Sequence, residues 1–115
     1  MSTRLEGKYA AEFLLSEGNG SISREQVVIA AAAPAMVAGT VLGRITASGK
    51  FAAYNNANSD GTQTAVGVLY EAVPDSTSDQ KAVAIVRYAE VQQLELTGYD
   101  AAAKPELEAL GIIVR

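Results

Sequence analysis

The sequence predicts a mainly β protein with one short C-terminal helix. Short apolar runs separated by Gly, Asn and Asp fill the stretch from Ala38 to Ala72, and such runs are typical of strands joined by turns. These runs are rich in Val, Leu, Phe and Tyr, which suit a pleated, half-buried surface. Only Asp100–Leu110 has a helical pattern. The 115 residues, 49% of them hydrophobic, suit one domain with a real core.

We expect residues 1–25 to form a flexible N-terminal arm. Met1–Tyr9 is polar, and chain ends without buried apolar groups are usually poorly ordered. Phe13–Leu15 is a short apolar patch on this arm. The patch either folds back onto the core or packs against a partner, and composition does not separate these two interpretations.

Residues 26–115 are expected to form a single β-rich domain. By periodicity alone, its first apolar segment, Gln26–Ala33, fits a strand or a helix. The β-branched residues Val27–Ile29 favour a strand, although part of the segment could also belong to the arm. Pro34 then biases Ala33 towards extended backbone.

The central stretch predicts three strands. Two turn signals separate them, Ser48-Gly49 and Asp60-Gly61, because Gly, Asn and Asp tolerate the backbone of tight turns. The expected strands are Val41–Ile45, Phe51–Tyr54 and Ala65–Leu69.

Two further strands are expected after the polar loop Asp75–Gln80. Lys81–Tyr88 is apolar on both faces, which is typical of a central strand. Val91–Leu96 alternates, with Leu94 and Leu96 on one face, and predicts another strand.

The helix expected over Asp100–Leu110 has start and stop signals. Pro105 suits a first helical turn, where its missing N–H is not needed. Gly111 suits the C-terminal stop. Ile112–Val114 is then expected to close the chain as a short strand.

The composition argues against several classes of function. The chain has no Cys and no His, so it cannot build disulfides, thiolate metal sites or a Ser–His–Asp arrangement. We therefore expect no enzyme activity, no catalytic residue, no metal and no cofactor. The net charge of -4 disfavours a basic nucleic-acid-binding surface, and no apolar run is long enough to span a membrane. No secretory signal is recognisable at the N-terminus.

One stretch invites comparison with a phosphate-binding loop. Five residues separate Gly43 from Gly49 where that motif needs four, and Phe51 stands at its Ser/Thr position. A hairpin turn is the better interpretation.

Three segments together resemble the head decoration proteins of tailed phages, the family of lambda head decoration protein D. They are EFLLSEGNGSISREQVVIA (Glu12–Ala30), AGTVLGRITASGKFAAY (Ala38–Tyr54) and SDGTQTAVGVLYEAV (Ser59–Val73). RYAEVQQLEL (Arg87–Leu96) is similar too. The resemblance covers most of the chain, in order and at plausible spacing.

The resemblance implies a small β-clip-like barrel and a homotrimer at local three-fold sites of the expanded head. There the trimer would bind the major capsid protein and cement it against internal DNA pressure. It also implies location on the outer surface of the virion, after synthesis in the host cytoplasm.

In this family the N-terminal arm adds to the capsid contact. The matching positions, carried over only by resemblance, are Glu12, Phe13, Leu14, Leu15, Ser16, Glu17, Ser23 and Arg24. An alternative is a small β-barrel module that binds a sugar or peptide through Asn55–Gly61, whose three Asn could hydrogen-bond hydroxyls.

Overall fold

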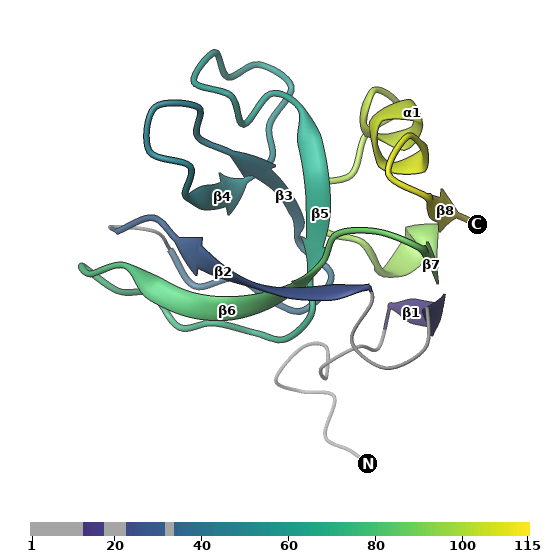
Figure 1. The fold of residues 1–115 in the computed structure, drawn as a ribbon, viewed down its shortest axis with the longest axis horizontal. Helices are drawn as coiled ribbons and strands as arrows, with labels where there is room; N and C mark the ends of the chain where they lie inside the picture. The colour runs from purple at the N-terminus through teal and green to yellow at the C-terminus, as the bar shows by residue number, and fades with distance from the viewer. Residues whose placement is uncertain (1–12, 18–22, 32–33) are drawn as a thin grey trace.

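The computed structural model of the protein describes residues 13–17, 23–31 and 34–115. A closed five-stranded barrel lies beside a three-stranded sheet, and one short helix packs on the same side of the barrel as this small sheet (Figure 1). The predicted mainly β fold, with a small barrel and one C-terminal helix, is therefore confirmed.

The barrel has the strand order β2-β4-β3-β5-β6, and the small sheet has the order β1-β7-β8. The barrel strands are β2 (Arg24–Ile29), β3 (Val41–Arg44), β4 (Phe51–Ala53), β5 (Ala65–Leu69) and β6 (Gln80–Ile85). The small sheet contains β1 (Leu14–Glu17), β7 (Ala89–Val91) and β8 (Ile112–Val114). The helical elements are η2 (Gln93–Glu95) and α1 (Ala103–Glu108).

The central stretch of the sequence supplies β3, β4 and β5, as predicted. β3 and β4 form an antiparallel hairpin, and Gly49 turns it with a positive φ of 76°. This hairpin is the segment that was compared with a phosphate loop. β6 pairs with β2 on one side and β5 on the other, which confirms its predicted central position.

Strand β2 pairs extensively with one of its neighbours in the barrel and very little with the other. Along its full length, from Arg24↔Ile85 to Ile29↔Gln80, β2 pairs with β6. With β4 it pairs only at Ile29↔Phe51. Among the described residues, the rest of the β2 edge therefore has no strand neighbour on the β4 side.

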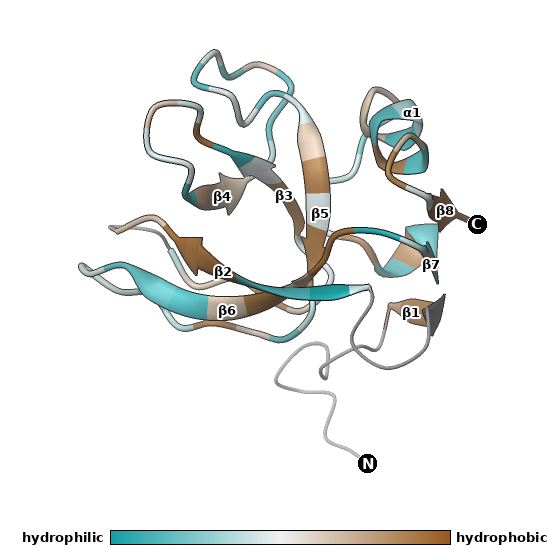
Figure 2. Cartoon of the chain, in the orientation of Figure 1, coloured by the Kyte–Doolittle hydropathy of each residue, from teal (hydrophilic) through white to brown (hydrophobic). Residues whose placement is uncertain are grey.

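Two apolar clusters make up the core. One fills the barrel, where the hydropathy colouring shows the apolar stretches of β2, β5 and β6 (Figure 2). The other joins the barrel to the small sheet and α1, and its fully buried members include Phe13, Val41, Val68, Val91, Leu107 and Ile112. This second cluster holds the two sheets together as one body.

The strand predicted over Val91–Leu96 is wrong. β7 ends at Val91, and Gln93–Glu95 forms a 3₁₀ turn in which Leu94 is 86% exposed. The chain turns because Glu95 N–H donates to Gln92 O, while Gln93 N–H donates to Arg115 O at 3.0 Å. The prediction was wrong because the alternation of Leu94 and Leu96 with polar residues has the same pattern as a half-buried strand.

The helix α1 is pinned to the barrel by two carboxylates. Tyr54 Oη donates to Asp100 Oδ1 at 2.8 Å, and the same oxygen accepts from Ala103 N–H at 2.9 Å. Glu106 Oε1 accepts from Ala65 N–H of β5 at 2.8 Å. Gly111 then ends the helical segment at φ 83°, as predicted.

Replacing Tyr54 with Phe should lower the free energy of unfolding by about 1–2 kcal/mol, because Asp100 loses a buried donor. Burial, followed by the hydrogen bond to Asp100, raises the pKa of Tyr54 well above its ordinary value. The unfolded chain thus releases this proton first, and stability falls as the pH rises above about 10. Urea unfolding measures this: between about pH 8 and about pH 11, the free energy of unfolding should fall less for Tyr54→Phe than for the wild type. An equal loss would contradict the assignment.

Residues 13–17 and 23–25 are the described part of the expected arm. Phe13 is fully buried, β1 pairs with β7, and β2 already begins at Arg24. The expected boundary at residue 25 thus falls inside a strand. Of the segment Gln26–Ala33, residues 26–29 belong to the strand β2 rather than to a helix, and residues 32–33 lie outside the description.

Candidate protein interaction face

The apolar patch Phe13–Leu15 divides between the core and the surface. Phe13 is 0% exposed and belongs to the cluster that joins the two sheets. Leu14 packs partly against the same cluster, whereas Leu15 is 49% exposed. Of these three predicted capsid-binding residues, only Leu15 presents a large apolar surface to a partner.

The next predicted positions form strand β1. Ser16 pairs with Glu90 and Glu17 with Ala89, beyond a register shift between Leu14 and Ser16. Glu12 lies outside the described residues. The pairing places β1 at one edge of the small sheet.

Ser23 and Arg24 lie where the barrel meets the small sheet. Ser23 is fully buried, and its hydroxyl donates to the backbone oxygen of Tyr88 at 2.7 Å. The guanidinium of Arg24 lies 4.2 Å from the centre of the Tyr70 ring. These contacts are within the chain: Ser23 fixes the start of β2 against the segment before β7, and Arg24 packs against Tyr70, which follows β5.

Sequence reasoning missed three exposed apolar residues of the same region. Tyr88 (62% exposed) directly precedes β7, Leu94 (86%) lies in η2, and Ile113 (38%) lies in β8. With Leu15, they make up four of the five large apolar residues exposed in the described ranges. We call these four residues the small-sheet face. A concentration of exposed apolar side chains is typical of a protein-binding surface.

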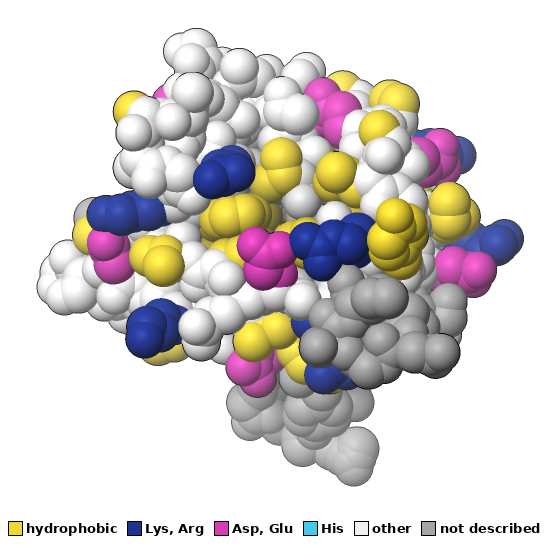
Figure 3. Space-filling model, viewed as in Figure 1, with side chains coloured by type: hydrophobic (Ala, Val, Ile, Leu, Met, Phe, Trp, Pro, Cys, Tyr) yellow, Lys and Arg dark blue, Asp and Glu magenta, His cyan; other side chains and the backbone are white. Residues whose placement is uncertain are grey.

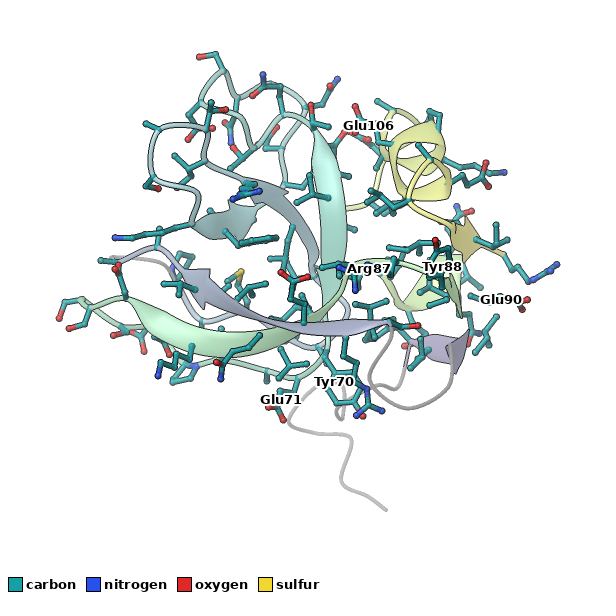
Figure 4. The ribbon with its side chains drawn as sticks, in the orientation of Figure 1. Tyr70, Glu71, Arg87, Tyr88, Glu90 and Glu106 are labelled. Carbon is teal, nitrogen blue, oxygen red and sulfur yellow. The ribbon has the colours of Figure 1, made fainter. Side chains whose placement is uncertain are left out.

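Tyr88 is held in an unusual backbone conformation. Its φ is 51°, which costs energy for a bulky residue and is most often found where structure or function requires it. A Cβ at Gly111 would lie only 2.9 Å from Tyr88 Cδ1, so the ring rests closely on the end of the helical segment. Figure 4 shows Tyr88 beside β7, with Arg87 pointing towards the barrel.

Charged residues also occur around the small-sheet face: Arg87 precedes Tyr88, Glu90 lies in β7 and Glu95 follows Leu94. Arg115 Nε lies 3.0 Å from Glu90 Oε1, with the two side chains 60% and 39% exposed. An ion pair this exposed adds little stability. The small-sheet face therefore offers a partner exposed apolar side chains with charged groups beside them.

The loop Asn55–Gly61, considered as an alternative ligand site, is largely occupied with its own contacts. Asn55 Oδ1 accepts from Ala57 N–H, and Asn58 Nδ2 donates to Thr62 Oγ1 at 2.8 Å. The side-chain hydrogen bond from Thr62 is the main reason that the pKa of Asp60 lies below its usual value. The loop uses these polar groups to hold its own shape.

No group of three Asp or Glu side chains that could hold a metal ion occurs within residues 13–17, 23–31 and 34–115. In the same ranges no helix has the length and apolarity needed to cross a membrane.

Four of the five large apolar residues exposed in the described ranges lie in or near the small sheet, a pattern typical of the class of protein-binding scaffolds. Comparison with known families agrees: residues 3–112 match the family model of bacteriophage lambda head decoration protein D. The chain therefore belongs to this family, as the resemblance implied. The family supports capsid decoration as its function, association with a phage capsid, and the virion as its location. No curated protein gives a significant sequence match.

Proposed function

We propose that the protein is a cementing protein that binds as a homotrimer at local three-fold sites of the expanded phage head. Its partner is the major capsid protein, and its role is to stabilise the shell from the outside against internal DNA pressure. It is made in the host cytoplasm and acts without enzyme activity, nucleic acid or membrane. The family match supports this function.

The observation that carries the proposal is the small-sheet face. Its members, Leu15, Tyr88, Leu94 and Ile113, are all exposed and lie in or near the strands of the small sheet. Leu15 is one of the predicted capsid-binding residues, and in the sequence it lies three residues after Glu12, another of them. Apolar and aromatic side chains of this kind supply most of the binding energy at the centre of an interface. Three copies in a trimer would add avidity.

The test is binding to empty heads of the cognate phage that lack decoration protein, in expanded and unexpanded forms. We expect saturable binding to expanded heads at three chains per three-fold site, and three chains per particle by light scattering. A protein that stays monomeric at high concentration, or that does not bind expanded heads, would refute the proposal.

Leu15→Glu should weaken head binding at least tenfold, since it places a charge on the small-sheet face without touching the core. Asn56→Glu is the matched control, because it adds the same charge in the exposed Asn55–Gly61 loop. Wild-type binding by Leu15→Glu would remove this face from the interface, and a loss with Asn56→Glu would move the contact to the loop. Quantitative sedimentation with heads measures both.

A further inference from the structure

A groove runs along the side of the barrel where β2 and β4 separate. It consists of two adjoining hollows of about 440 Å³ each, which share Glu25, Arg44 and Phe51. The space-filling view shows apolar side chains in this hollow and charged side chains around it (Figure 3). We call it the β2–β4 groove.

The wall of the groove is a sheet edge. In an antiparallel ladder, successive residues turn their backbone groups alternately towards and away from the partner strand. Val86 N–H donates to Ser23 O at 2.9 Å, so Glu25 and Val27 follow Ser23 in facing β6. Gln26 and Val28 then face the groove, where no described strand pairs with β2 before Ile29. Such an edge is a template for another strand.

The groove also has an apolar lining. Val66, Val86 and Leu110 line one hollow, Val27 and Val28 line the other, and Phe51 lines both. At 37%, Val28 is the fifth exposed large apolar residue of the described ranges, and the only one outside the small-sheet face. A strand added to β2 would cover it.

Of the three positively charged residues that line the groove, two are paired with described carboxylates and Arg44 is not. Arg87 pairs with Glu25 at 2.8 Å, and Lys50 pairs with Asp79 at 2.6 Å. The hydrogen bond from Lys50 is the main cause that lowers the pKa of Asp79. Arg44 lines both hollows, yet its Nε donates to Gly49 O, and it forms no ion pair with any described carboxylate.

The groove is continuous with the small-sheet face. Tyr88 lines the groove together with Arg87 and is also a member of that face. A partner that covers the small-sheet face therefore reaches the groove without a gap, which favours the same partner for both.

We propose that the β2–β4 groove binds an extended, acidic segment of the major capsid protein. The segment adds as a strand to the edge of β2 at Gln26 and Val28, which no described strand covers before Ile29, and places a carboxylate against Arg44. The edge from Glu25 to Val28 accommodates about four residues at about 3.3 Å each. This inference rests on the proposed function, because it takes the capsid shell as the source of the strand.

Two substitutions test the two parts of this contact. Gln26→Pro removes an N–H that faces the groove and leaves the β2–β6 ladder intact. Arg44→Glu reverses the charge at an exposed position. Each should weaken binding to expanded heads at least tenfold. The matched controls, Gln26→Thr and Arg44→Lys, keep the N–H and the charge and should bind within about threefold of wild type.

The outcomes separate the inference from the function it rests on. If wild type binds heads and both Gln26→Pro and Arg44→Glu bind equally well, the groove proposal falls and the proposed function stands. If wild type does not bind, both fall. A changed number of chains per particle in either variant would show that a second copy occupies the groove, which also overturns the proposal. If Gln26→Pro does not fold, as judged by circular dichroism, Arg44→Glu decides.

Discussion

Replacing Phe13 with Ala should lower the free energy of unfolding by about 3–5 kcal/mol, the range for removing a buried aromatic ring. Phe13 is fully buried in the cluster that joins the barrel to the small sheet, and its backbone oxygen accepts from Gln92 N–H at 2.8 Å. The lost ring leaves a cavity between elements that cannot easily close together. Urea unfolding at one fixed protein concentration measures the change.

Leu15→Ala is the control, because Leu15 is two residues away and 49% exposed. It should cost less than about 1 kcal/mol. Equal losses for the two variants would contradict the placement of Phe13. The contrast also sets the limit for truncation: a deletion that tests the N-terminal segment has to end before Phe13, or it removes part of the core.

Gly43→Ala is expected to destabilise the fold by about 3 kcal/mol or more, because overpacking against backbone cannot be relieved by a rotamer change. A Cβ at Gly43 would lie 2.4 Å from the Cα of Thr62. Thr62 is 1% exposed and cannot move outward freely, since Asn58 and Asp60 both hydrogen-bond to it. Soluble yield and the urea midpoint measure the effect.

Gly98→Ala is the matched control. Gly98 has a φ of 81° but only Tyr54 O, at 3.9 Å, near its Cβ position, so it should cost only the strain of the left-handed backbone, about 1–2 kcal/mol. If Gly43→Ala destabilises the fold no more than Gly98→Ala does, the loop around Thr62 must shift to make room for the added Cβ.

Local signals in the sequence were sufficient for much of the fold. Turn residues separated the strands of the barrel, and Pro105 and Gly111 marked the helical segment that contains α1. The role of Gly43 could not be predicted this way, because its neighbour Thr62 arrives from another loop. The end of β7 at Val91 depends on a bond from Gln93 to Arg115, which is also non-local.

The candidate site was only partly visible for the same reason. Resemblance selected the N-terminal positions, of which Leu15 is the exposed apolar one. Tyr88, Leu94 and Ile113 carried no local motif. They join Leu15 only because β1 and β8, from opposite parts of the sequence, both pair with β7.

The pairing of β2 with β6 has a consequence for the order of folding. If β1 paired with β7 first, the pairing would close a loop made of residues 18–88. If Arg24 is already paired with Ile85, only the short connections 18–23 and 86–88 remain to be closed. With closure entropy growing as the logarithm of loop length, the prior pairing reduces that cost by about 2 kcal/mol. We therefore expect the barrel to act as the template on which the small sheet assembles, so that the surface proposed to bind the capsid is completed late.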